Sequence, residues 1–246
     1  MFSKLKEEDF EVLKGPLESG RQSPSALAGI LILAIFLQSL LFSIEYFVVG
    51  RYSVYPYKDN ILIVHFWIIV ILTVLSLIYA IPIVYKKSER IQYLLSILLS
   101  QNLFSITVLI TVLFTVGYER EGEGVSEDSL ILFTYIILGV GLLIFIATFI
   151  RFYILLRKGH YRKGSKKDKL RGRFETSSYV PVAIIAGLGI VFTIQYIART
   201  TAINDINMMM LIVIGIALFF VMQFVLPEQL VILYCKYRFK SFNFDK

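Results

Sequence analysis

The sequence predicts an all-α, polytopic membrane helix bundle with six transmembrane helices and both termini on the cytoplasmic side. Of the 246 residues, 57% are hydrophobic and 17% are charged, and the mean hydropathy is +0.73. Soluble domains typically contain about 45–50% apolar and about 25% charged residues. The charges here are also clustered between long apolar runs, a pattern typical of membrane proteins rather than of a large soluble core.

The number of spans follows from the apolar runs. A helix needs about 20 residues, at about 1.5 Å each, to cross about 30 Å of hydrocarbon. Ser23 and Pro24 supply an N-cap and a first-turn proline for the first span, and Asp59 and Asp128 are candidate caps for the second and fourth. The predicted spans are residues 27–49, 61–85, 91–116, 130–150, 179–198 and 206–226.

Two prolines bear on where helices end. Pro82 lies near the inner end of the second span, where a kink costs least. Pro227 follows the sixth apolar run, and a further apolar stretch, 230–235, comes after it. Two arrangements are open: a long tilted helix that continues to Tyr234, or a helix broken at Pro227 whose remainder lies at the interface. Of a bend and a clean stop, we expect the bend.

Orientation follows from the lysines and arginines, which are in excess on the cytoplasmic side. If the six spans alternate in direction, 21 of the 25 lysines and arginines fall on one side of the membrane. This predicts a cytoplasmic arm at 1–26, a transmembrane domain at 27–235 with a basic cytoplasmic loop at 157–178, and a cytoplasmic tail at 236–246. Spans 1–3 and 4–6 then run in opposite directions, as in inverted-repeat transporters, but the halves have no residue-level similarity, so the repeat stays open.

The arm carries apolar residues at a loose helical spacing, up to Gly15 and Pro16. Two placements are open for it. It can lie on the inner leaflet as an interfacial helix, although its acidic residues weaken such binding. It can also contact the cytoplasmic loops of the protein itself.

The first two spans contain the candidate intramembrane polar site. Glu45 lies about 27 Å along its helix, near the outer surface, and Gln38 lies on the same face. His65 lies near the outer end of the second span. A Glu45–His65 pair at equal depth would relay a proton or bind a cation. The alternatives are an interfacial carboxylate that reaches water or Arg51, and a histidine that only packs.

The third span adds Gln101 and Asn102 as candidate lining residues of a polar pathway. Small and hydroxyl residues also recur at helical spacing in the third, fourth and fifth spans, and such stripes let helices approach closely and hydrogen-bond across the interface. We expect these stripes to serve helix packing, and a polar pathway through the bundle is the alternative.

The strongest feature outside the membrane is the basic loop. Its cations are expected to contact anionic lipid headgroups, and a docking site for an acidic partner is the alternative. Nucleic-acid binding is not expected, because no supporting fold or aromatic interleaving accompanies the charges. The predicted contact residues are Arg157, Lys158, Arg162, Lys163, Lys166, Lys167, Lys169, Arg171 and Arg173.

Function is less constrained than fold. No catalytic motif, metal-ligand cluster or cofactor signature is present, and the two histidines, His65 and His160, are expected on opposite sides of the membrane, so we expect no enzyme. We expect a lipid-embedded interaction or accessory component of a transport or secretion system, or an immunity-type membrane protein, with a protein partner or a homo-oligomer. A small permease with a polar site around Glu45, His65 and Gln101 is the alternative, and an intramembrane enzyme is a third.

The composition is rich in isoleucine, phenylalanine, tyrosine and lysine. In this respect it resembles membrane proteins of bacteria with AT-rich genomes. That resemblance implies the bacterial cytoplasmic membrane as the location.

Overall fold

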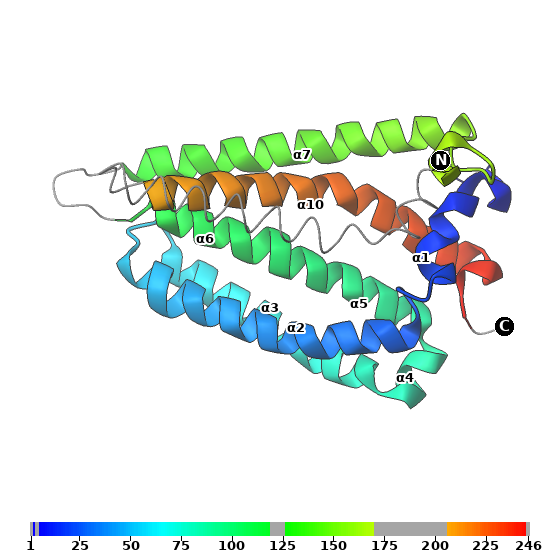
Figure 1. Ribbon diagram of the computed structural model, residues 1–246. Coiled ribbons are helices and arrows are strands. Elements are labelled where there is room, and N and C mark those ends of the chain that lie inside the picture. Colours follow the sequence, from blue (N-terminus) through cyan, green and yellow to red (C-terminus); the bar gives the residue numbers. More distant parts are fainter. Residues whose placement is uncertain (1, 3–4, 119–125, 170–205, 245–246) are drawn as a thin grey trace.

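The computed structural model describes residues 2, 5–118, 126–169 and 206–244, and these residues form a helical protein (Figure 1). Five helical stretches are long and apolar enough to cross a membrane. Within the described ranges, β-structure is limited to one isolated antiparallel bridge, between Ser53 and Tyr118. The five stretches are Pro24–Tyr52, Lys58–Ala80, Glu89–Val116, Glu127–Arg157 and Met208–Arg238.

Several of these stretches consist of more than one element. The first is α2 followed by a π-helical segment, η3, and a short 3₁₀ segment, η4, and the third is α5 and α6 joined by a second π-helical segment, η5. The bounds are η2 Glu7–Lys14, α1 Gly15–Glu18, α2 Pro24–Ile44, η3 Glu45–Val49, η4 Gly50–Tyr52, α3 Lys58–Ala80, α4 Pro82–Lys87, α5 Glu89–Gln101, η5 Asn102–Ile106, α6 Thr107–Val116, α7 Glu127–Arg157, α10 Ile206–Arg238 and η6 Lys240–Phe242.

The helices pack in two groups that share the α5–η5–α6 helix. On one side α2 packs against α3, and both contact α5; on the other side α10 packs against both α6 and α7 (Figure 1). Both α7 and α10 run in the same direction, toward the end of the bundle where α1 lies. We call this the terminal end of the bundle.

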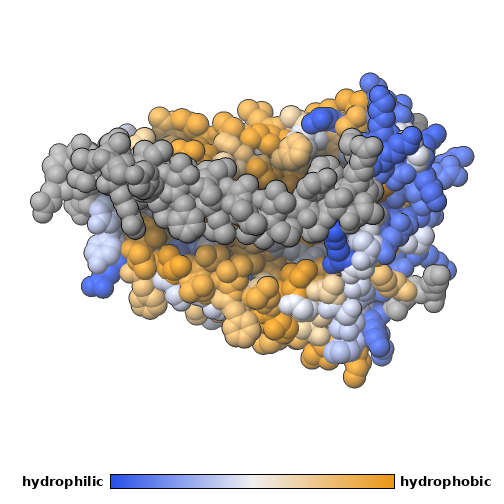
Figure 2. All heavy atoms as spheres, viewed as in Figure 1, coloured by the Kyte–Doolittle hydropathy of each residue, from blue (hydrophilic) through white to orange (hydrophobic). Residues whose placement is uncertain are grey.

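The surface matches a lipid environment. Hydrophobic residues cover the visible sides of the bundle, whereas hydrophilic residues gather at the terminal end (Figure 2). Large apolar side chains on α2, α3 and α7 are more than half exposed, including Phe36, Trp67 and Leu143. A soluble protein rarely exposes so much contiguous apolar surface, so the exposed faces support helices embedded in a membrane.

The sequence predictions of helix starts were right for the first span only. Ser23 caps α2, with its Oγ accepting a hydrogen bond from the Ala26 N–H at 3.2 Å, and Pro24 is the first helical residue. Asp59 and Asp128 are not caps, because each lies inside the first turn of its helix. Ser126 caps α7 instead, through the Ser129 N–H.

The prolines act differently from each other. The second span does not merely kink at Pro82 but is interrupted, because the preceding Ile81 has extended backbone and a new helix, α4, begins at the proline. In contrast, α10 continues through Pro227 to Arg238, beyond the expected Tyr234. Figure 1 shows α10 changing direction toward its C-terminal end, as expected of a helix with an internal proline. The predicted fifth span, 179–198, lies outside the described residues.

The N-terminal arm packs on the bundle itself. Phe10 and Leu13 are fully buried in a cluster with Phe152, Leu156 and Cys235 from α7 and α10. Backbone and ionic contacts add to this cluster: the Val12 N–H donates to the Tyr161 carbonyl at 2.9 Å, and the Arg162 guanidinium lies 2.7 Å from the Asp9 carboxylate.

Candidate functional site

The structure brings Glu45 and His65 together. Oε1 of Glu45 lies 2.8 Å from Nδ1 of His65, and the side chains are 0% and 2% exposed. Glu45 begins η3 at the end of α2, and His65 lies two turns into the antiparallel α3. Ionisable groups are expensive inside a membrane unless they are paired, and when present they commonly mark ion or proton sites. Glu45 therefore does not reach water or Arg51, which was the plainer expectation.

The second ring nitrogen of His65 faces the third span. Nε2 lies 3.4 Å from Oγ1 of Thr107, and this hydroxyl donates to the Asn102 carbonyl at 2.8 Å. Because the Thr107 hydroxyl donates its single hydrogen bond to that carbonyl, its oxygen can only accept a hydrogen bond from His65 Nε2. The imidazole then uses Nε2–H toward Thr107 and shares the proton on its Nδ1 side with Glu45. The hydrogen-bond directions thus fit one shared proton between Glu45 and His65.

Both helices that flank His65 depart from α-helical geometry at this site. Glu45 is the first residue of the π-helical segment η3, and Asn102 is the first residue of η5. Gly50 closes η3 by donating its N–H to the Glu45 carbonyl, and a Cβ at Gly50 would lie only 2.8 Å from that oxygen. Single π-helical turns are rare and are frequent at functional sites.

Two buried polar groups at these turns lack partners within the described residues. They are the second carboxylate oxygen of Glu45 and both amide atoms of Asn102, whose side chain is 1% exposed. A buried polar group without a partner is costly, and in native structures it commonly indicates a water, an ion or a catalytic role. The polar site therefore has unused hydrogen-bonding capacity.

The other two predicted residues lie apart from this pair. Gln38 is buried two turns further toward the terminal end on α2, and its Nε2 donates to Thr73 Oγ1 at 2.6 Å. Gln101 contacts α10 instead, with its Nε2 3.4 Å from the Met222 carbonyl. Beside it, Gln223 donates to Ser105 Oγ at 3.0 Å, so the glutamines connect helices rather than gather around His65.

Aromatic rings separate the pair from the lipid-facing side of α2 and α3. The Phe42 ring stands edge-on to His65 with centroids 5.8 Å apart, and it also contacts Phe66 at 5.7 Å. Phe42 and Phe66 line an apolar groove of about 470 Å³ on the outside of the two helices, together with Trp67. The groove therefore ends at the ring that covers the polar site.

The described members of the predicted lipid-contact set lie at the last residue of α7 and in the segment that follows it, which we call the turn after α7. Arg157 lies over the Tyr153 ring, Arg162 pairs with Asp9, and Lys167 donates to the Tyr161 hydroxyl at 2.7 Å. The remaining described members of the set are exposed; Arg171 and Arg173 lie outside the described residues. The exposed members are Lys158, Lys163, Lys166 and Lys169.

Sequence reasoning missed a second buried ionic contact, at the terminal end. Lys236 is 1% exposed and donates to the Phe242 carbonyl at 3.0 Å, with its Nζ 3.9 Å from the Glu89 carboxylate. Both residues fall outside the predicted spans, and they are buried because α5 begins early, α10 ends late and η6 folds over them. A signal was present: Glu89 lies only two residues before the third apolar run.

A comparison of the chain with known protein families, curated proteins and solved structures finds no match.

Proposed function

We propose that the chain is a small proton-linked permease of the bacterial cytoplasmic membrane, with Glu45 and His65 as its proton-binding pair. The observation that carries the proposal is the 2.8 Å contact between these two side chains, buried between the ends of two apolar helices. Of the functions considered from sequence, the geometry favours the permease over the accessory component. Six spans are few for a carrier acting alone, so the functional unit is a homo-oligomer.

The proposed topology has six spans with both termini in the cytoplasm. The parallel direction of α7 and α10 supports it, because two parallel neighbours need one further crossing between them, where the sequence predicts a span at 179–198 (Figure 1). The hydrophilic terminal end, with its basic residues, supports the orientation (Figure 2).

The pair suits proton transfer for an electrostatic reason. With one shared proton, the two side chains carry no net charge, and the buried site is at its least costly. A second proton leaves a neutral acid beside a cationic imidazolium, and loss of the proton leaves an unpaired carboxylate. Both changes favour helix movement or water entry, and the two π-helical turns provide backbone that can rearrange. A change in protonation is thereby coupled to conformation.

Proton movement in liposomes tests the proposal. The protein is reconstituted into liposomes that contain a pH dye. In one arm the liposome lumen also contains a small-molecule extract of bacterial cells, and in both arms an inside-negative potassium potential is applied. We expect wild-type protein to acidify the lumen faster than empty liposomes in at least one arm. Glu45→Gln and His65→Asn should abolish the difference, and His160→Asn is the matched control because His160 is exposed at the terminal end. Unchanged rates in both site variants would contradict the proposal.

Orientation has its own test, with a membrane-impermeant maleimide and intact cells. In a Cys235→Ala background, Lys166→Cys should be labelled only after the cells are opened, whereas Asn60→Cys should be labelled from outside. Both positions are exposed and lie at opposite ends of the bundle. Labelling of Lys166→Cys in intact cells would overturn the topology.

An accessory component of a transport or secretion system, or an immunity-type protein, is the second candidate. The apolar groove on α2 and α3 favours it, because exposed rings such as Trp67 suit a neighbouring membrane helix. A photo-crosslinker at position 67 distinguishes the two: one dominant adduct with a different membrane protein favours the accessory role, and an adduct between copies of the chain favours the oligomeric permease.

A further inference from the structure

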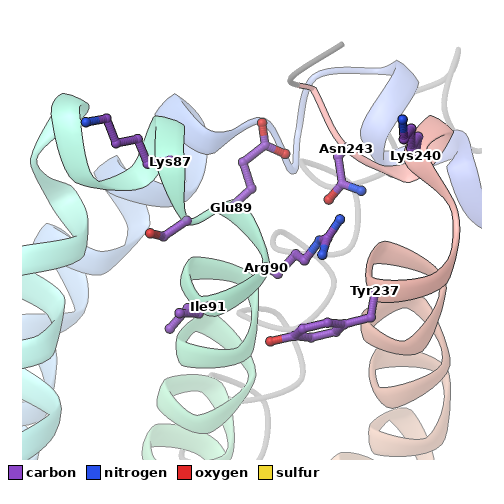
Figure 3. Close-up of a pocket in the computed structure, with 8 residues that line it drawn as sticks. Lys87, Glu89, Arg90, Ile91, Tyr237, Lys240 and Asn243 are labelled. Carbon is purple, nitrogen blue, oxygen red and sulfur yellow. The ribbon is translucent and has the colours of Figure 1, made fainter.

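A pocket of about 550 Å³ opens at the terminal end of the bundle, far from the Glu45–His65 pair (Figure 3). It lies between the start of α5 and the end of α10, where the chain continues into η6. Its lining includes three cationic side chains, Lys87, Arg90 and Lys240, and the ring of Tyr237. These residues come from sequence-distant elements, so only the tertiary structure brings them together.

The positive charge of this pocket is not neutralised from within. Glu89 is the acidic residue of the lining, but its Oε2 accepts the Phe244 N–H at 2.9 Å and lies 3.9 Å from the Lys236 ammonium. Its charge is thus directed toward the buried Lys236. The cations of the lining remain in excess, and the pocket is suited to an anion.

Arg90 is the best-placed group for binding. Its guanidinium lies over the Tyr237 ring, 5.5 Å from the centroid, and Figure 3 shows it extending from α5 toward α10 and Asn243. Within the described part of the chain it makes no hydrogen bond or ion pair, so its N–H donors are free for a ligand. A guanidinium held by an aromatic face is a preferred donor for phosphate. Lys87 points away from this gap in Figure 3, so Lys240, on the α10 side of the pocket, is the second cation of the proposed site.

The position of the pocket indicates where the anion comes from. One spanning stretch begins at Glu89 and another ends at Arg238, so the pocket lies at the membrane surface. The ring of Tyr237 is half exposed, as is typical of tyrosines at the headgroup level, and the exposed side chain of Ile91 is an apolar member of the lining. The N-terminal end of α5 adds its positive dipole to the same place.

We propose that this pocket binds the phosphate of an anionic phospholipid headgroup, held by Arg90 and Lys240. It is a discrete site, separate from the basic turn after α7. A soluble phosphate has the same chemistry, but the position of the pocket at the membrane surface and its apolar lining residue, Ile91, favour the lipid.

Lipid binding to the purified, full-length protein tests the proposal. Native mass spectrometry is carried out with phosphatidylglycerol and with phosphatidylcholine, and inorganic phosphate is added as a competitor. The test variant is Arg90→Gln/Lys240→Gln, and the matched control is Lys163→Gln/Lys166→Gln, which removes the same charge from exposed positions in the turn after α7. Both variants replace exposed residues and should fold normally, which size-exclusion chromatography checks.

We expect phosphatidylglycerol to bind about tenfold more tightly than phosphatidylcholine, and the test variant to lose about tenfold in affinity while the control loses less than about twofold. Equal losses in the two variants would overturn the proposal, because they would show only general charge attraction. Complete competition by millimolar inorganic phosphate would overturn the assignment to a lipid in favour of a soluble phosphate.

Discussion

The ring edge of Phe219 on α10 occupies the space beside Gly141 on α7 where any other residue would carry its Cβ. A Cβ built at Gly141 would lie 2.6 Å from Phe219 Cε1. Gly141 belongs to the small-residue stripe that the sequence suggested for helix packing, and here it lets α7 and α10 approach closely. In lipid, such close packing replaces the hydrophobic effect as a source of helix association.

Gly141→Ala should therefore destabilise the bundle by about 1–3 kcal/mol, because the added methyl group overlaps a buried ring. Thermal unfolding in detergent measures the change. Gly139→Ala is the control, since its Cβ would meet nothing within 4 Å and alanine is the better helix former. Equal unfolding temperatures for the two variants would show that the α7–α10 contact is looser than described.

Removing His65 should destabilise the fold strongly. In His65→Ala, Glu45 keeps its buried position but loses its ionic partner, and a buried charge left alone costs about 3–5 kcal/mol. The measurement is unfolding in mixed SDS–detergent micelles, with His160→Ala as the exposed control. Adding Glu45→Gln should recover part of the loss, because the residue left behind is then uncharged; no recovery would mean that His65 acts mainly by packing.

Acid should loosen the N-terminal arm. Hydrogen bonds from Ser241 and Lys14 hold the pKa of Glu7 below its ordinary value of 4.5. Because the pKa of Glu7 is lower in the docked arm than in the undocked one, the ionised carboxylate stabilises docking at pH values above the undocked pKa. This stabilisation is lost as the pH falls through the pKa of the docked state. Hydrogen exchange of residues 7–14 should thus speed up as the pH drops below about 4.5, after correction for the intrinsic exchange rate.

The same arm contact can be weakened without acid. For Glu7→Gln we expect corrected exchange roughly two to five times faster at neutral pH, since exposed ion pairs contribute little. On Lys14, burial acts to lower the pKa but the hydrogen bonds to Glu7 and Glu11 outweigh it, so the pKa is raised and Lys14 stays charged throughout this range. An arm whose exchange ignores both acid and the substitution would not be held by Glu7.

Cys235 offers a probe of the terminal end, because it is the single cysteine and is fully buried. Phe10 packs in the same cluster. Phe10→Ala should leave a cavity there and raise the rate of maleimide labelling of Cys235 on the order of tenfold. Phe36→Ala is a suitable control, since Phe36 is 70% exposed on the lipid-facing side of α2. Equal labelling in the two variants would place the arm away from Cys235.

Much of the candidate site was visible in the sequence, but not its geometry. Glu45 and His65 stand out as ionisable residues in apolar runs, and helix rise alone places them at similar depth. Their contact depends on how two helices are rotated about their axes, which no local pattern specifies. Gln101 shows the same limit, because it shares a span with Thr107 yet faces α10 rather than His65.

The sequence by itself determined that the helices lie in a membrane and roughly where they begin and end, because the length of apolar runs and the distribution of charge act locally along the chain. The tertiary structure decided which polar groups meet. It introduced the π-helical turns at Glu45 and Asn102, buried Lys236 against Glu89, and assembled the cationic pocket around Arg90. The physical reason is that these features are set by packing between helices, and packing depends on side chains far apart in sequence.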